Sequence, residues 1–198
     1  MEYLVSMTTH VPDGTPAETV DDVRAREAAH TSELIAEGHI LRLWRPPLRP
    51  GEWRTLGLFA ATDAGELGQV LASMPLHVWR TDAVTPLGRH PNDPYGEPAT
   101  AGTDFFTIFT RTVPDGTPTE AVVAAEGREA VRAKDLGGQG HLLRLWMLPG
   151  EGRALGLWRA SDADELQTYL DSLPLSPYQK VTDTPLTEHP SDPPIASR

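Results

Sequence analysis

The sequence predicts an α+β fold in which two ferredoxin-like βαββαβ repeats pack sheet to sheet as an intrachain dimeric α+β barrel. The first observation is an internal repeat within the 198 residues, because three segments recur 102 positions later: Val11–Pro16, Arg26–Ala28 and Leu41–Trp44. The second is the same order of strand-like and helix-like patterns in both copies. The third is that a sheet with helices on one face must bury its other face, and a second copy supplies the cover.

Beyond Trp44 the spacing between the copies falls from 102 to 99, so the first copy holds three extra residues in a proline-rich loop. We therefore expect a first repeat at residues 1–98, a linker at 99–103 and a second repeat at 104–198. Fusion of two copies of a small domain that once paired with itself accounts for this arrangement.

The first half of each copy reads as a strand followed by a long helix. In the first copy the strand is expected at 3–9. We expect Thr15 to cap a helix that runs to about Glu37, with Pro16 in its first turn and Glu18 completing a capping box. The helix ends there because a glycine follows.

The second half of each copy adds two strands, a helix and a last strand. The strands are expected at 39–45, 54–60 and 78–84. The helix is expected at 64–73, because Asp63 can cap its start and a proline follows its end. The proline-rich segments after each copy read as arms.

Composition excludes several classes of function. With 17 Lys and Arg against 28 Asp and Glu, the net charge is −11, which argues against nucleic-acid or anionic-membrane partners. The absence of cysteine excludes disulfides, thiolate nucleophiles and cysteine-ligated metals. The histidines lack metal-ligand spacing, so no metal is expected. Neither a signal peptide nor a membrane-length apolar run is recognisable, so we expect a cytoplasmic protein.

Two ionisable residues interrupt the apolar face of the first long helix. One stripe of this helix carries five residues at spacings of 3, 4, 3 and 4: Val20, Val23, Glu27, His30 and Leu34. A carboxylate facing a sheet is costly unless it is paired or reaches water. Glu27 therefore indicates either a structural pair with an arginine of the sheet or a pocket with Glu27 as proton carrier and His30 as its helper.

The second strand supplies candidate binding residues. Side chains alternate across a sheet, so His39 and Arg45 are expected on one face and Arg42 and Trp44 on the other. The sequence leaves open which face meets Glu27. An arginine with an aromatic neighbour suits an anionic, partly flat ligand, although Trp44 could simply fill the core.

The two copies differ at these positions. The second-copy equivalents of four candidates are Glu129, Arg132, Arg144 and Trp146. Arg24 has become Glu126 and Arg45 has become Met147. We therefore expect the first copy to hold the site that is used, and the second to have drifted toward a scaffold or a different ligand.

The order of these motifs resembles the muconolactone delta-isomerase family. The matching stretches are Arg24–Glu27, Arg42–Arg45, Met74–Leu76 with Trp79, and Thr85–Pro91, and most recur in the second copy. The resemblance covers nearly the whole chain, twice. It implies an isomerase without cofactor that shifts a double bond in an unsaturated lactone by moving a proton. It also implies a small-molecule substrate and a homo-oligomer, because family members assemble into rings of dimers.

The resemblance also implies roles for individual residues. Glu27 stands at the family's helix acid, Arg24 at its basic position one turn earlier, and Trp44 with Arg45 at its Trp-Arg pair. Arg42 stands where degradative members often have histidine. The predicted function is isomerisation of a lactone such as muconolactone. Two alternatives stay open: a cyclase or rearrangement enzyme of secondary metabolism on the same barrel, or a non-catalytic small-molecule binding or assembly protein.

Overall fold

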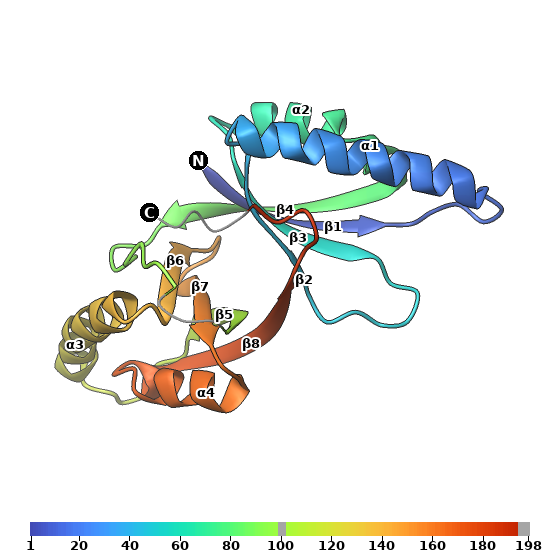
Figure 1. Cartoon of the computed structure of the whole chain (residues 1–198). Coiled ribbons are helices and arrows are strands. Elements are labelled where there is room, and N and C mark those ends of the chain that lie inside the picture. Colours follow the sequence, from blue (N-terminus) through green and yellow to red (C-terminus); the bar gives the residue numbers. More distant parts are fainter. Residues whose placement is uncertain (99–101, 194–198) are drawn as a thin grey trace. The chain divides into compact units, whose positions relative to one another are not determined.

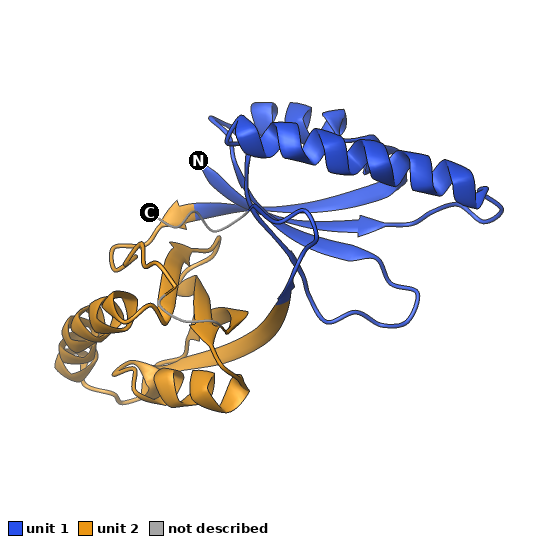
Figure 2. Ribbon diagram, in the orientation of Figure 1, with its two compact units in different colours: residues 1–87, 187–198 blue, residues 88–186 orange. Residues whose placement is uncertain are grey.

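The computed structural model describes residues 1–98 and 102–193 and divides the chain into two compact units. Unit 1 comprises residues 1–87 and 187–198, and unit 2 comprises residues 88–186 (Figure 2). Each unit therefore includes the C-terminal segment of the other sequence repeat. Residues 99–101 of the expected linker lie outside the described residues. Repeats at 1–98 and 104–198 remain our proposal for how the chain arose.

Unit 1 has the predicted βαββαβ order, and its two α-helices cover the same face of the sheet (Figure 1). Its elements are β1 (Glu2–Thr9), α1 (Ala17–Ala36), β2 (Ile40–Arg45), β3 (Arg54–Ala60), α2 (Ala64–Ser73), the 3₁₀ helix η1 (Pro75–Trp79) and β4 (Arg80–Arg89). The antiparallel strand order is β4-β1-β3-β2. Thr187 and Glu188, contributed by the second repeat, pair with β2.

Unit 2 repeats this plan. Its elements are β5 (Thr103–Arg111), α3 (Thr119–Gly138), β6 (Leu142–Met147), β7 (Arg153–Ala160), α4 (Ala163–Asp171), the 3₁₀ helix η2 (Ser176–Tyr178) and β8 (Gln179–Glu188). The strand order is β8-β5-β7-β6, and Gly88 and Arg89 of the first repeat pair with β6. The predicted α+β class with two ferredoxin-like repeats is confirmed. No helix in the described part of the chain has the length and apolar character to cross a membrane.

The helix-facing side of each sheet carries a hydrophobic core. In unit 1 alternate residues of β1 point to this side, and Tyr3, Val5 and Met7 are all buried in one cluster with Leu34 of α1. In unit 2 the corresponding cluster is centred on Leu136 and Trp158, which are 0 % and 1 % exposed. The long helices therefore owe their stability to one buried stripe rather than to caps.

A bulge in β2 overturns the regular alternation expected for this strand. Its register against β3 shifts between Ile40 and Arg42. Ile40 and Leu43 consequently both lie in the helix-side cluster, although strict alternation would separate them. Beyond the bulge, alternation resumes and sets Trp44 on the other face from Leu43. β6 carries the same bulge between Leu142 and Arg144.

Two expectations about element ends are wrong. Thr15 does not cap α1, because its hydroxyl donates to the Pro12 carbonyl at 2.7 Å and so closes the preceding turn. The last strand of the first copy, expected at 78–84, is β4 at Arg80–Arg89. It begins later because the chain first makes the 3₁₀ helix that starts at Pro75. Asp63 caps α2 as predicted, accepting hydrogen bonds from two backbone N–H groups.

A glycine in the third strand of each copy makes room for an aromatic ring. A Cβ added to Gly57 would lie 2.4 Å from Cε2 of Phe59. At Gly156 it would lie 2.6 Å from Nε1 of Trp158, the nitrogen that donates to Thr107 Oγ1 at 2.8 Å. Both glycines are therefore required by close packing and not by backbone conformation.

We predict that Gly57→Ala lowers the free energy of unfolding by about 1–3 kcal/mol, because the buried ring of Phe59 must move to admit a methyl group. Gly68→Ala is the matched control: Gly68 lies inside α2 with nothing within 4 Å of an added Cβ. It should gain about 0.5–1 kcal/mol from helix propensity. Urea denaturation measures both, and equal effects of the two substitutions would contradict the packing argument.

Candidate active site

A cavity lies beside the long helix in each unit. We call the first the Glu27 cavity, with a volume of about 240 Å³, whose wall includes Glu27 of α1, Arg45 of β2 and His189. We call the second the Glu129 cavity, with a volume of about 530 Å³, whose wall includes Glu129 of α3 and His90. In both cavities the histidine comes from the other sequence repeat, so each wall is built from both copies.

The Glu27 carboxyl is held by one backbone amide and one arginine. It accepts a hydrogen bond from the Leu76 N–H at 2.8 Å and lies 3.3 Å from Nη1 of Arg80. Burial raises the pKa of Glu27, while the Leu76 N–H and the Arg80 charge oppose that rise. The sequence posed a pocket and an ion pair as alternatives, and the structure contains both.

Arg80 is a cavity residue that the sequence did not single out. Its side chain is 2 % exposed, and it forms ion pairs with Glu27 and, at 2.6 Å, with Asp82. It also donates to the Leu71 carbonyl at 3.1 Å. The available signal was an arginine at the start of a strand whose second-copy counterpart is Gln179. Arg80 thus fixes the Glu27 carboxyl at the cavity wall.

Arg24 and Arg45 give the Glu27 cavity its positive character. The Arg24 guanidinium lies over the Trp53 ring, 4.9 Å from its centroid. Within the described residues, neither Arg24 nor Arg45 forms a salt bridge. Burial, followed by the Arg45 charge, lowers the pKa of His189 to about 4, so this imidazole is neutral at physiological pH. The cavity therefore combines one carboxyl with cations able to bind an anion.

The two histidines that the sequence predicted as site residues lie outside the cavity wall. His30 bonds through Nδ1 to the Glu33 carboxyl and through Nε2 to the Ser73 hydroxyl, both at 2.8 Å. It thereby ties α1 to the end of α2. His39 lies 3.2 Å from the Ala60 carbonyl through its Nδ1.

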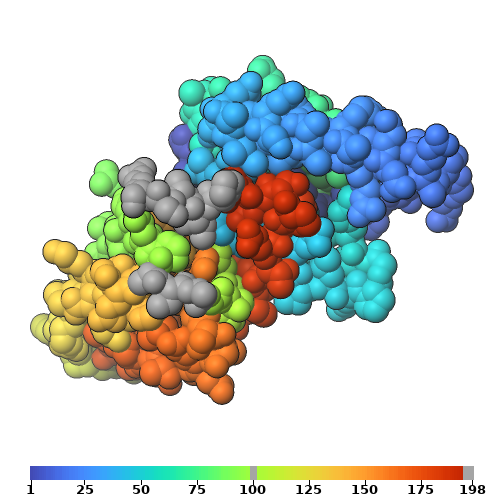
Figure 3. All heavy atoms as spheres, in the orientation of Figure 1, coloured from blue at the N-terminus to red at the C-terminus, as the bar shows by residue number. Residues whose placement is uncertain are grey.

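Arg42 and Trp44 also lie away from the cavity wall, on the other face of β2. Trp44 is 0 % exposed, and the Arg42 guanidinium lies 4.9 Å from its ring centroid. Arg42 Nε lies 3.0 Å from Asp192, which also accepts from the Leu43 N–H. These contacts anchor the C-terminal segment that carries His189. This segment, red in Figure 3, lies at the surface beside α1.

The second copy keeps the backbone hydrogen bond to its helix glutamate but has different charged residues around it. Glu129 accepts from the Leu175 N–H at 2.9 Å, and burial raises its pKa against the opposing effects of that N–H and of Arg111. Arg111 itself pairs with Glu126 at 2.7 Å.

The remaining second-copy candidates have structural contacts. Arg132 donates to the Ser172 hydroxyl at 2.9 Å, as His30 contacts the end of α2 in unit 1. Arg144 lies 3.1 Å from Asp93 and 4.7 Å from the ring centroid of Trp146. Across the described residues, no group of three or more His, Asp or Glu side chains is arranged to hold a metal ion.

Comparison with known proteins identifies relatives of each half of the chain. The family model described as muconolactone delta-isomerase matches residues 1–93 and 104–192. A muconolactone Delta-isomerase from Cupriavidus pinatubonensis is 36 % identical over 92 residues, which are 46 % of this chain and 97 % of that protein. Muconolactone Delta-isomerase 1 from Acinetobacter lwoffii is 34 % identical over 92 residues, 46 % of this chain and 93 % of that protein.

A solved structure extends the likeness to nearly the whole chain. A heme-binding protein from Thermus thermophilus covers 96 % of this chain and 93 % of its own, with a TM-score of 0.61 and 12 % sequence identity. At this identity the likeness shows the α+β fold alone.

We predict that Arg80→Gln lowers the free energy of unfolding by about 3–5 kcal/mol at neutral pH, because it leaves two buried carboxyls without their cation. The loss should shrink at mildly acidic pH, since burial raises the pKa of Glu27 and its carboxyl can then bind a proton and lose its charge. The double variant Arg80→Gln with Asp82→Val reproduces the second copy's Gln179 and Val181 and should recover part of the loss. A loss independent of pH, with no recovery, would contradict the ion-pair assignment.

Proposed function

The chain belongs to the muconolactone delta-isomerase family, and from that premise we propose that it is an isomerase without cofactor that shifts the double bond of an unsaturated lactone carrying a carboxylate, such as muconolactone. The observation that carries the proposal is the buried Glu27 carboxyl in the wall of a small cavity that also presents Arg24 and Arg45. We assign the reaction to this cavity.

Glu27 is the proton carrier in this proposal. Its carboxylate takes a proton from the carbon next to the double bond that is conjugated with the lactone carbonyl, and the electron pair of that C–H bond spreads through a dienolate. The Glu27 carboxylic acid then returns the proton at the other end of the conjugated system, so the double bond moves and no atom is gained or lost. The raised pKa of Glu27 favours both steps, because a carrier works best when its pKa approaches the working pH.

Arg24 and Arg45 are the proposed substrate-binding residues. A guanidinium can bind the substrate carboxylate with two hydrogen bonds and can stabilise charge that develops on the dienolate oxygen. Arg80 holds Glu27 in place. We propose His30 and Arg42 as positioning residues, since His30 ties α1 to α2 and Arg42 fixes the segment that bears a cavity residue.

The family premise also supports proposals about the setting of this reaction. We propose a small-molecule substrate, assembly into a homo-oligomer and a cytoplasmic location. The net charge of −11 supports the absence of a nucleic-acid partner, because binding to phosphate requires a positive surface.

We predict that Glu27→Gln lowers kcat for muconolactone isomerisation by about 10²–10⁴-fold, the usual contribution of one positioned base, with little change in KM. The amide keeps an acceptor for the Leu76 N–H but cannot carry the proton. Glu18→Gln, an exposed first-turn change in the same helix, is the control and should retain the activity. Undiminished turnover by a folded Glu27→Gln protein would remove Glu27 from the mechanism.

The matched substitution Glu129→Gln should cost less kcat toward muconolactone than Glu27→Gln does, because the proposal places the reaction in the first cavity. The same steady-state assay compares the two variants. The reverse order of losses would move the site to the second cavity and contradict our assignment.

We predict that the acid limb of the pH profile of kcat/KM lies above the ordinary glutamate pKa of 4.5, because burial raises the pKa of Glu27 and only its ionised form can accept the proton. Arg80→Gln should move this limb to still higher pH, since the Arg80 charge opposes the rise. A profile that is flat from pH 4.5 upward in the unaltered protein would exclude Glu27 as the titrating base.

A further inference from the structure

We propose that the Glu129 cavity is a second ligand site that binds a larger, uncharged and mostly apolar carbonyl compound, and that it discriminates against anions. The inference does not rest on the isomerase proposal, because it concerns the other cavity and is tested by binding rather than by turnover.

The size of the Glu129 cavity is the first argument. Its volume of about 530 Å³ compares with about 240 Å³ for the Glu27 cavity. Three residues lining the Glu27 cavity have smaller counterparts in the second copy: Trp53 is Gly152, Thr55 is Ala154 and Thr31 is Ala133. A Cβ on Gly152, which has a φ of +64°, would lie 2.8 Å from Cβ of Arg111. Both the backbone conformation and this close approach therefore favour glycine here, and the cavity stays wide at this point.

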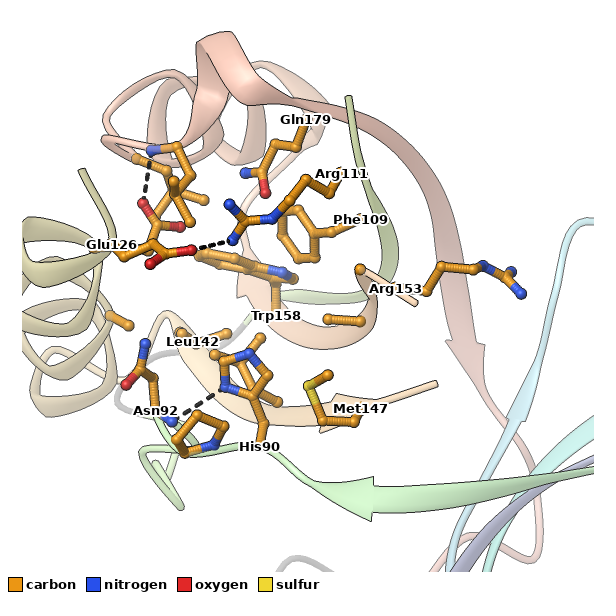
Figure 4. A pocket seen from close by; sticks show the side chains of 18 residues that line it. His90, Asn92, Phe109, Arg111, Glu126, Leu142, Met147, Arg153, Trp158 and Gln179 are labelled. Atoms are coloured by element: carbon orange, nitrogen blue, oxygen red, sulfur yellow. Dashed lines mark hydrogen bonds and ion pairs between the residues drawn. The ribbon is translucent and has the colours of Figure 1, made fainter. Parts of the chain in front are cut away.

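The charge of the Glu129 cavity is the second argument. The three arginines of the Glu27 cavity have no cationic counterpart: Arg24 is Glu126, Arg45 is Met147 and Arg80 is Gln179. Two other arginines line the wall. Arg111 is paired with Glu126 at 2.7 Å, and the side chain of Arg153 extends away from the cavity (Figure 4). Burial lowers the pKa of His90, which keeps its imidazole neutral. An anion entering this cavity would therefore meet the Glu129 carboxyl, and the arginine whose charge acts on that carboxyl, Arg111, is already paired with Glu126.

The polar groups that remain suit a carbonyl oxygen. The Gln179 amide points into the cavity, near Arg111 (Figure 4), and its Nε2 is buried without a hydrogen-bond partner among the described residues. A buried donor without a partner is costly, and a ligand carbonyl would satisfy it. Because burial raises the pKa of Glu129, its carboxyl can also donate when protonated.

The apolar walls suit a flat molecule. Trp158 and Phe109 are among the residues that line the cavity, where they are 1 % and 7 % exposed, and the Trp158 ring is fixed by its bond to Thr107. Aromatic surfaces of this kind bind planar apolar groups, while a few placed polar groups fix their orientation. Size, neutrality and flat walls together distinguish this cavity from the smaller, arginine-rich one.

Two probes of nearly the same shape test the proposal: 2-acetylnaphthalene, which is an uncharged ketone, and 2-naphthoate, which is an anion. Binding to the full chain is followed by quenching of tryptophan fluorescence in a Trp53→Phe protein, which removes the tryptophan of the Glu27 cavity. We expect saturable binding of the ketone at least about tenfold tighter than that of the anion. Excess muconolactone should not displace the ketone.

Two substitutions place the binding in the Glu129 cavity. Ala154→Phe fills the cavity and should abolish ketone binding, whereas Ala124→Phe on the exposed face of α3 should leave it unchanged. Met147→Arg restores the cation of the first copy at a partly exposed position and should raise 2-naphthoate affinity at least about tenfold. Met147→Leu controls for loss of the thioether and should keep the preference for the ketone.

Equal affinities for the two probes, no saturable ketone binding, or ketone binding that survives Ala154→Phe in a folded protein would each overturn the proposal. If Ala154→Phe fails to fold, the comparison of Met147→Arg with Met147→Leu still decides it: an unchanged preference in both variants overturns the assignment. Loss of muconolactone turnover alone concerns the isomerase proposal and leaves this result intact.

Discussion

A carboxyl group buried under a helix must find donors within the protein, and both copies of this chain meet that requirement in the same way. Glu27 and Glu129 each accept the backbone N–H of a leucine at the entry to a 3₁₀ turn. An amide at such an entry lacks an intrahelical acceptor, so the bond satisfies both partners. The bond fixes where the long helix meets the turn after the second helix. It therefore determines where a cavity can exist, whatever residues line it.

Around this shared bond the two copies have diverged in coupled sets. Arg24 rests on Trp53 in unit 1, whereas unit 2 has Glu126 paired with Arg111 beside Gly152. These changes are linked by contact: a tryptophan at position 152 would collide with Arg111, and Arg111 without Glu126 would lose its ion pair. The interior shows similar coupling, since the Trp158 N–H donates a hydrogen bond to Thr107, a threonine that the first copy lacks. Packing and charge therefore explain why residues in contact with one another differ together between the two copies.

The sequence predicted what depends on local pattern. The bounds of β3 and α2 follow from strand alternation and from the Asp63 cap, and the inward direction of Glu27 follows from the helical period. It could not predict the β2 bulge, because an extra residue in a strand leaves no mark on the composition. The predicted partners of Glu27 were arginines of β2, the strand nearest to it in sequence. Arg80 comes from β4 instead, 53 residues away, and only tertiary packing decides that choice.

The exchange of terminal segments has an evolutionary consequence. His189 helps to enclose the cavity around Glu27, and His90 does so for the cavity around Glu129, although each histidine is encoded in the opposite half of the gene. A mutation in either half can thus alter both pockets, one through the helix and one through the tail. Each half of the chain therefore supplies part of the wall of the cavity that lies beside the long helix of the other half. Under the duplication and fusion that we propose, the two cavities have come to depend on residues from both halves of the chain.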